Sequence, residues 1–217
     1  SGKRVSDLVS GIDLGPASLG LAEIPIPDYM EGINFLDKSV QSREYVISTR
    51  DRCDFTIDRI RSVRSKNFKY IRNFKTDRPY TQLTYMDVNT VEFVKVMKEL
   101  YVENKLDSIQ VRFMRNERPE EELYDLSTDP FELCNLAQNA DYSDTLQKFR
   151  GILNQWISET DDKGQYPEEI EGLKLMLGIW GKYAVNPEYN DLRIQFPDLE
   201  GSLFELKNQG WKEVESD

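Results

Sequence analysis

Residues 58–80, DRIRSVRSKNFKYIRNFKTDRPY, hold two strand-like runs, RIRSVR and FKYIRNF, on either side of the polar tripeptide SKN. A polar turn between two such runs predicts an antiparallel hairpin. Alternate residues of the second run share one face: Phe68, Tyr70, Arg72 and Phe74. The first run is less regular because Ile60 and Val63 have opposite parity. We therefore expect a strand that is covered on both faces or interrupted by a bulge.

The same segment is strongly basic. Between Arg59 and Arg78 it carries eight Lys or Arg residues and one acid, in a chain whose formal net charge is −11. Cations interleaved with aromatic residues could grip a sulfate or phosphate polyanion through charge-assisted hydrogen bonds. Composition alone favours the other interpretation, in which acidic side chains of the same chain neutralise them. The acidic remainder would repel a long duplex, so nucleic acid is not an expected partner.

Composition narrows the functional classes further. The chain has 217 residues with 39% hydrophobic content, enough for one core with a smaller satellite. No apolar run approaches the ~18 residues that a membrane span needs, so none is expected. Histidine is absent, which disfavours Ser-His-Asp and Cys-His catalysis and most zinc sites. Cys53 and Cys134 lack activating neighbours, and we expect buried thiols ahead of a disulfide or a nucleophile.

Outward from the hairpin, the apolar spacing predicts further elements. The stretch 6–32 reads as one or two short helices that IPIPDY (24–29) ends, with Pro16 suited to the first turn of the second piece. Residues 43–49 (REYVIST) read as a strand. ELYDLSTDPFELCNLA, from Glu122, reads as a short strand followed by a turn-rich loop. The fold class that follows is α+β, a small antiparallel sheet with packed helices.

Two long helices are expected to pack on this sheet. One spans residues 87–106, with Asn89 or Thr90 as N-cap and Val91 opening its apolar stripe. The other begins near Ser143 and places five apolar residues on one face: Leu146, Phe149, Leu153, Trp156 and Ile157.

Motifs for nucleotide binding, serine hydrolysis or EF-hand calcium binding are absent from the sequence. Two acidic pairs, DRCD at 51–54 and TDDKG at 160–164, could hold a divalent cation through carboxylate oxygens. Solvated turns are the favoured interpretation, because short acidic pairs are common in a chain this acidic.

Four blocks in order, over about residues 5–168, resemble the sulfatase family: LVSGIDLGPASLGLAEIPIPDYMEG, IDRIRSVRSKNFKYIRNFKTDRPY, EELYDLSTDPFELCNLAQN and LQKFRGILNQWISETDDKGQYPE. The branch they resemble most includes heparan N-sulfatase and bacterial polysaccharide sulfatases. Departures are Ala17 followed by Ser18, where the family often has Thr, and Glu23, where it usually has Gly. The Cys/Ser-x-Pro/Ala-x-Arg motif that yields formylglycine is missing, as are the family's metal ligands and histidines.

The resemblance therefore implies a C-terminal portion of a formylglycine-dependent sulfatase with an alkaline-phosphatase-like fold. The parent protein would hydrolyse sulfate esters or sulfamates of a carbohydrate, with calcium and formylglycine in a catalytic portion upstream of Ser1. Residues 1–40 would be a helical segment continuing from that portion, 41–168 the C-terminal α+β subdomain, and 169–217 an extension wrapping the body. A periplasmic or extracellular location is implied as well.

On this resemblance the chain has two partners, the catalytic portion and the sulfated carbohydrate, and is inactive alone. Its site residues would be Arg50, Asp51, Arg52 and Asp54, just before the hairpin, where they would help to rim the substrate pocket. Two alternatives are a stand-alone module that binds sulfated glycans and a structural subunit covered by another chain. A large exposed apolar patch would disfavour the stand-alone module.

Overall fold

The computed structural model describes residues 2, 6–82 and 92–203 of the chain. The predicted cap residues Asn89 and Thr90 and the stripe residue Val91 lie outside the described residues. The chain divides into two compact units. Unit 1 is Ser1–Thr49, Arg61–Arg72 and Glu121–Asp161, and unit 2 is Arg50–Ile60, Asn73–Glu120 and Asp162–Asp217.

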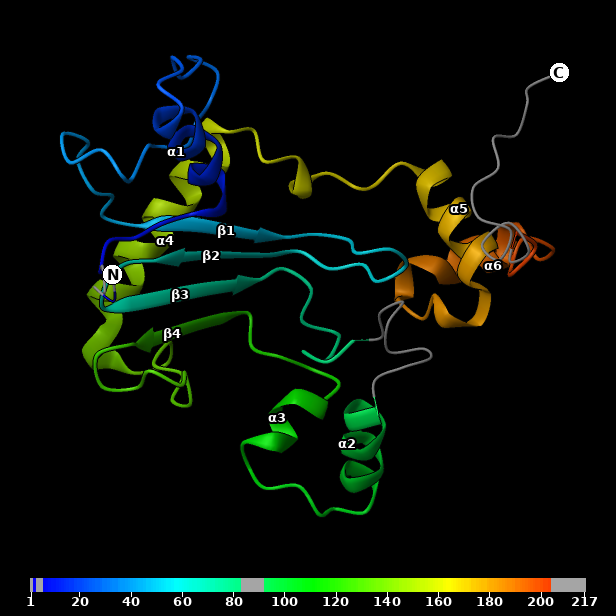
Figure 1. Ribbon diagram of the computed structural model, residues 1–217. Coiled ribbons are helices and arrows are strands. Elements are labelled where there is room, and N and C mark those ends of the chain that lie inside the picture. The colour runs from blue at the N-terminus through cyan, green and yellow to red at the C-terminus, as the bar shows by residue number, and fades with distance from the viewer. Residues whose placement is uncertain (1, 3–5, 83–91, 204–217) are drawn as a thin grey trace, which may run out of the picture. The chain divides into compact units, whose positions relative to one another are not determined.

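The predicted hairpin forms the centre of a four-stranded antiparallel sheet. Its strands lie in sequence order: β1 (Val46–Arg50), β2 (Ile60–Arg64), β3 (Phe68–Asn73) and β4 (Glu121–Asp125) (Figure 1). The Ser65 amide donates to the Phe68 carbonyl oxygen at 2.8 Å and closes the turn between β2 and β3. Between β3 and β4, Tyr70 stands opposite Leu123. The expected α+β fold class is confirmed.

Burial alternates along β2, so one face of the strand is fully covered and the other is partly covered. Arg61 and Val63 are fully buried on one face, whereas Ile60 on the other is partly buried. The apolar pattern looked irregular because a buried position of the strand holds an arginine, which sequence patterns usually assign to the surface.

Helix α4 (Ser143–Glu159) supplies the other half of the unit 1 core, as predicted. Leu146, Phe149 and Leu153 are buried, and Trp156 and Ile157 pack beside them. They meet Val63, Tyr70 and Leu123 of the sheet. Figure 1 shows α4 running across one face of the strands.

The beginning of unit 1 is organised around a buried carboxylate. The short turn η1 (Gly11–Asp13) leads into α1 (Leu14–Leu21), and Pro16 lies in the first turn of α1 as predicted. Asp13 is fully buried and accepts hydrogen bonds from the Ser10 and Ile33 amides at 2.8 and 2.9 Å and from Arg43. Burial raises the pKa of Asp13, but these hydrogen bonds outweigh it and leave that pKa lowered.

Unit 2 is mainly helical. Its helices are α2 (Glu92–Val102), α3 (Gln110–Met114), α5 (Ile170–Trp180) and α6 (Asn190–Gln195). Short 3-10 turns occur in both units: η2 (Ala140–Tyr142), η3 (Lys163–Gln165), η4 (Gly181–Tyr183) and η5 (Pro187–Tyr189). The core joins the residues after β1 to α5, with the rings of Phe55 and Trp180 centred 4.8 Å apart. Among the described residues, no helix combines the length and apolarity needed to cross a membrane.

Candidate functional site

Of the four residues predicted to rim a substrate pocket, Arg50 ends β1, and the turn that follows carries the other three: Asp51, Arg52 and Asp54. Backbone hydrogen bonds of 2.9 Å in both directions between Cys53 and Thr56 close this turn. Asp54 sits at its apex with a positive φ of 47°, a conformation in which aspartate is tolerated better than most residues. Phe55 and Ile57 anchor the turn in the unit 2 core.

Arg52 fixes the turn to the segment that follows η3. Its Nε donates to Glu168 Oε2 at 2.6 Å, and its Nη1 donates to the Asp54 carbonyl oxygen at 2.6 Å. Both partners belong to unit 2, so two hydrogen bonds of the Arg52 guanidinium hold the turn in place. Arg50 lies 4.0 Å from the buried carboxylate of Asp58, and 42% of its side chain is exposed.

A cleft of about 620 Å³ opens beside this turn, wholly within unit 2. Asp51 and Glu168 line it, so the structure brings Asp51 to the cleft directly and Arg52 through its hydrogen bond to Glu168. Phe74 and Tyr166 give the cleft two aromatic side chains. Arg50 and Asp54 do not line it.

Paired charges occupy the rest of the cleft wall. The Arg59 guanidinium stacks 3.7 Å from the centre of the Phe74 ring, and its Nη2 donates to Asp162 at 3.4 Å. Lys75 Nζ lies 2.8 Å from Glu188 Oε1. Burial raises the pKa of Glu188, but hydrogen bonds from Lys75, the backbone and Arg78 outweigh it, so its pKa is lowered and the carboxylate stays charged.

Beneath the cleft lies a buried polar network that the sequence did not predict. Asp58 accepts hydrogen bonds from Arg118 Nη1 at 3.0 Å, from Arg118 Nη2 and from Gln82 Nε2 at 2.8 Å. Gln82 in turn accepts from Asn186 Nδ2 at 3.0 Å, and Asn186 accepts from the Ile57 amide at 2.9 Å. These residues are far apart in the sequence, and no local pattern marks them as partners.

The two acidic pairs do not build a metal site. Asp162 pairs with Arg59 and accepts from the Gly164 amide at 3.3 Å, as a residue capping a turn does. No group of three or more Cys, Asp or Glu side chains within the described ranges is arranged to hold a metal ion. Cys53 and Cys134 are both free and exposed, so the prediction that they are buried is wrong. Each belongs to a surface turn, where an apolar side chain has no core to enter.

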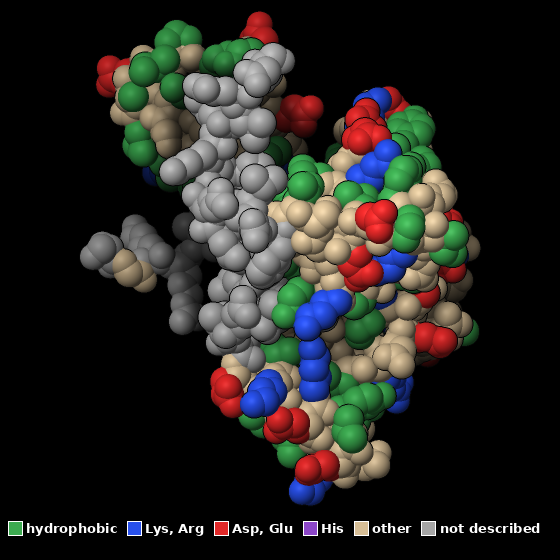
Figure 2. Space-filling model, turned by 90° about the vertical axis from the view of Figure 1, so that its right-hand side faces the viewer, with side chains coloured by type: hydrophobic (Ala, Val, Ile, Leu, Met, Phe, Trp, Pro, Cys, Tyr) green, Lys and Arg blue, Asp and Glu red, His purple; other side chains and the backbone are tan. Residues whose placement is uncertain are grey.

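Most cations of the basic segment are engaged within the protein. Six of the eight between Arg59 and Arg78 have interaction partners: Arg59, Arg61, Lys69, Arg72, Lys75 and Arg78. Figure 2 shows acidic and basic side chains intermingled on the face that it presents. Internal neutralisation therefore accounts for most of the segment. The other two, Arg64 at the end of β2 and Lys66 in the turn between β2 and β3, have no ion-pair partner among the described residues.

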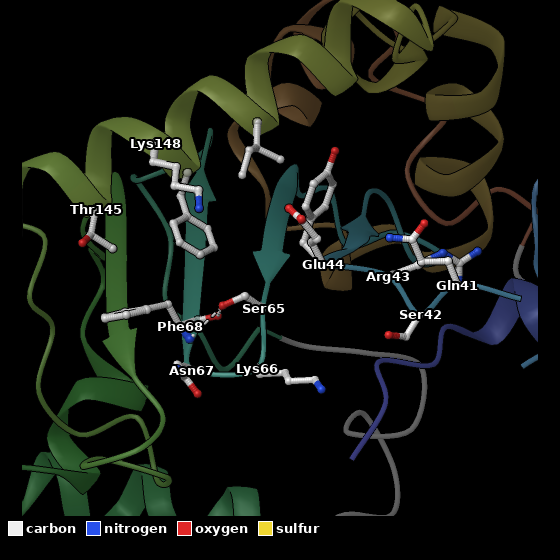
Figure 3. A pocket seen from close by; sticks show the side chains of 13 residues that line it. Gln41, Ser42, Arg43, Glu44, Ser65, Lys66, Asn67, Phe68, Thr145 and Lys148 are labelled. Carbon is white, nitrogen blue, oxygen red and sulfur yellow. Dashed lines mark hydrogen bonds between the residues drawn. The ribbon is translucent and has the colours of Figure 1, made fainter. Parts of the chain in front are cut away.

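A second cavity, of about 550 Å³, lies in unit 1 (Figure 3). It is bounded by the segment before β1, by the turn between β2 and β3, and by α4. Lys66, Phe68 and Lys148 are among its lining residues. No residue is shared between this cavity and the unit 2 cleft.

Comparison with known proteins identifies relatives of one kind. Two proteins of Formosa agariphila, each described as an ulvan-active sulfatase, are similar to this chain. One is 34% identical over 191 residues, which are 86% of this chain and 31% of the relative. The other is 30% identical over 168 residues, 74% of this chain and 31% of the relative. The chain thus spans about a third of the length of these relatives.

Among solved structures, a 2-O GAG sulfatase shares the fold with a TM-score of 0.52 and 23% identity. The alignment covers 77% of this chain and 29% of that protein. No protein-family model matches the chain.

Proposed function

We propose that this chain, which belongs to the sulfatase family, is the C-terminal part of an enzyme that removes sulfate from a sulfated polysaccharide. The observation that carries the proposal is the alignment with the two ulvan-active sulfatases, which covers most of this chain and only 31% of each relative. Since both relatives are named for ulvan, a polysaccharide of that class is the proposed substrate.

The chemical step is assigned to the portion of the enzyme that this chain does not contain. Sulfatase relatives imply a formylglycine nucleophile and a calcium ion. The residues present do not fit either group: the sequence has no Cys/Ser-x-Pro/Ala-x-Arg motif and no histidine, and its described part has no cluster of metal ligands. We therefore derive no catalytic step from this chain, and we expect it to be inactive alone.

Its proposed contribution is to shape the substrate pocket through the unit 2 cleft. Asp51 would accept hydrogen bonds from sugar hydroxyl groups, and Phe74 and Tyr166 would pack against the apolar face of a sugar ring. Arg52 would act mainly by holding the turn, because Glu168 and the Asp54 carbonyl already occupy two of its donors. Arg50 and Asp54 remain proposed rim residues that would contact substrate from outside the cleft.

Exposed hydrophobic residues near the start of the chain support a covering catalytic portion. Ten large ones within residues 9–40 are more than a third exposed: Val9, Ile12, Leu14, Leu21, Ile24, Ile26, Tyr29, Phe35, Leu36 and Val40. Such a concentration is unusual for a surface that faces water. It favours a chain that packs against more protein, and it argues against a stand-alone glycan-binding module.

The role of Asp51 is tested by substituting it in the intact enzyme. Asp51→Ala should raise the KM for sulfated oligosaccharide by about tenfold, since one lost charge-assisted hydrogen bond is worth roughly 1.4 kcal/mol or more. Asp141→Ala, which removes an exposed acid outside both cavities, is the matched control and should leave KM unchanged. Equal KM values for the Asp51 variant and the unsubstituted enzyme would remove Asp51 from the substrate pocket.

A further inference from the structure

Residues 162–168, which we call the strap, run along the unit 2 cleft, and all of them except Asp162 line it. Two ion pairs fasten the strap to the connection between β1 and β2, one at each end. Arg59 Nη2 donates to Asp162 Oδ2 at 3.4 Å, and Arg52 Nε donates to Glu168 Oε2 at 2.6 Å. All four residues belong to unit 2, so the strap and the segment that holds it are parts of one compact unit.

The two ends of the strap are fastened differently. The side chains of Asp162 and Arg59 are only 7% and 15% exposed. Asp162 also accepts a hydrogen bond from the Gly164 amide and begins the η3 turn, so this end is part of the packed structure. The side chains of Arg52 and Glu168 are 29% and 34% exposed, and water competes for their pair. The Glu168 end is therefore the more easily released one.

The backbone near Glu168 has little support of its own. Hydrogen bonds of 3.1 Å close the η3 turn as far as Tyr166. Beyond it, the amides of Glu168 and Glu169 donate no hydrogen bond to another described residue, and Pro167 has no amide hydrogen to donate. The Glu168 carboxylate therefore supplies the hydrogen bond that attaches this part of the strap to the turn after β1.

Tyr166 is the side chain that this attachment places in the cleft. It is 54% exposed, and the Lys163 ammonium, also on the strap, lies 5.6 Å from the centre of its ring. Only Pro167 separates Tyr166 from Glu168. Because the proline ring fixes one backbone dihedral between them, a displacement of Glu168 is passed on to Tyr166.

The other aromatic side chain of the cleft does not depend on Glu168. Phe74 is held by Arg59, whose guanidinium stacks 3.7 Å from the centre of its ring. The turn after β1 likewise keeps the 2.6 Å hydrogen bond from Arg52 to the Asp54 carbonyl oxygen when Glu168 is removed. Loss of the Glu168 carboxylate should therefore displace Tyr166 and leave the rest of the cleft in place.

We propose that Glu168 is a positioning residue, which through its ion pair with Arg52 holds Tyr166 in place to pack against a sugar unit of the polysaccharide. The identity of the ligand rests on the proposed function. The chemical step is assigned to another portion of the enzyme, so a small aryl sulfate brings no sugar unit to this cleft, whereas an oligosaccharide does. Glu168 thus contributes to the preference of the enzyme for a polymer over a small sulfate ester.

Replacement of Glu168 in the intact enzyme tests this role. Glu168→Ala should raise the KM for a sulfated ulvan oligosaccharide about fivefold with little change in kcat, because about one ring contact is lost. The KM for an aryl sulfate should change far less. Glu200→Ala is the matched control: it breaks an Arg193–Glu200 pair of similar exposure, 26% and 37%, outside the cleft, and should leave both KM values unchanged.

Thermal midpoints of the two variants should lie within about 2 °C of the unsubstituted enzyme, since each loses a partly exposed pair. A KM for the oligosaccharide that is the same in the Glu168 variant and the unsubstituted enzyme would overturn the proposal. An equal rise in KM for the aryl sulfate would overturn it as well.

A double-mutant cycle with Tyr166→Ala separates positioning from direct contact. Tyr166→Ala alone should raise the KM for the oligosaccharide by at least as much as Glu168→Ala does. If Glu168 acts through Tyr166, the variant with both substitutions should have the KM of Tyr166→Ala. Additive effects would mean that Glu168 contacts the sugar by itself, which contradicts the positioning role.

Sulfate release and binding, measured on the same samples, separate this inference from the proposed function. If the enzyme releases sulfate from the oligosaccharide and Glu168→Ala leaves KM unchanged, the inference fails and the proposed function stands. If no tested substrate releases sulfate, the proposed function fails, and the calorimetric Kd of the oligosaccharide decides the inference. A Kd raised by Glu168→Ala but not by Glu200→Ala supports it; equal Kd values, or no binding, overturn it.

Discussion

At the scale of single residues, Asp58 joins segments of unit 2 that are far apart in the sequence. Its carboxylate has no exposed surface and faces the equally buried guanidinium of Arg118, with Gln82 as a third partner. Two charges removed from water are stable only while each is paired and hydrogen-bonded. The turn that carries Asp51 and Arg52 leads directly to Asp58. Its position therefore depends on the pair between Asp58 and Arg118, although Asp51 and Arg52 take no part in that pair.

Asp58→Asn should therefore lower the free energy of unfolding by about 3 kcal/mol or more, because it leaves a buried guanidinium without its counter-charge. Urea titration followed by the fluorescence of Trp180, which lies in the unit 2 core, measures the loss. Glu103→Gln breaks the exposed Glu103–Lys105 pair and should cost under ~1 kcal/mol. A comparable loss in both variants would contradict the importance of the buried pair.

Glu121 makes unit 1 sensitive to acid. Arg150 donates to both of its carboxylate oxygens, and this hydrogen bonding, opposed by burial and aided by Tyr70, leaves the pKa of Glu121 below its ordinary value. A lowered folded-state pKa contributes stability that is present above the unfolded-state pKa, about 4.3 for glutamate, and is lost as the pH falls through the folded value.

Arg150→Gln should accordingly destabilise unit 1 at about pH 7 and have a smaller effect at about pH 3, because the stability that the pair contributes is lost as the pH falls through the lowered pKa of Glu121. Urea midpoints from Trp156 fluorescence in the unsubstituted and Arg150→Gln proteins provide the comparison. A difference between the two proteins that is the same at both pH values would show that the pair does not set the pH dependence.

At the scale of elements, α4 has room for a side chain at Gly151, whereas the loop after α1 has none at Gly32. Gly151 lies within this helix, and a Cβ atom added there would meet nothing within 4 Å. Gly151→Ala should raise the free energy of unfolding by about 0.5–1 kcal/mol, since alanine loses less backbone entropy in a helix. Gly32 is the contrast, because a Cβ there would lie 2.1 Å from the carbonyl oxygen of Ile12.

Gly32→Ala should thus be destabilising by about 1–3 kcal/mol, as expected for overpacking against backbone. Thermal midpoints of the two glycine variants and the unsubstituted protein, measured in the same buffer, test both effects. A destabilised Gly151→Ala protein would mean that α4 packs more tightly on that side than its described surroundings indicate.

The elements that the sequence predicted correctly are those with local periodicity. The hairpin follows from alternation around a polar turn, and α4 from five apolar residues at helical spacing. Arg61 was hard to place because its burial depends on partners elsewhere in the fold. The same holds for Arg118, Gln82 and Asn186, which meet Asp58 or each other only after distant segments have packed.

The candidate site was predicted only in part for the same reason. Asp51 lines the cleft, but Phe74, Tyr166 and Glu168 complete it from segments that no motif connects with residues 50–54. The unit 1 cavity likewise joins Lys66 with Lys148, which are far apart in the chain. The residue pattern identified the basic segment, but only the fold shows which of its cations have an ion-pair partner among the described residues.

On the scale of the whole molecule, the chain reads as one part of a larger enzyme. We propose that its unit 2 cleft contacts sugar, and the described residues include no group of three or more Cys, Asp or Glu arranged to hold a metal ion. The exposed hydrophobic residues between Val9 and Val40 are suited to contact with further protein. Binding and catalysis would thus be divided between this chain and the portion that precedes it in its relatives.

The most direct test is sulfate release measured by ion chromatography, with calcium present, from an aryl sulfate and from sulfated ulvan oligosaccharides. The 217-residue chain is compared with a protein extended upstream to the full length of its sulfatase relatives. We expect release by the extended protein alone. Release by the 217-residue chain itself would contradict the account, because it would require a catalytic site without histidine or formylglycine among these residues.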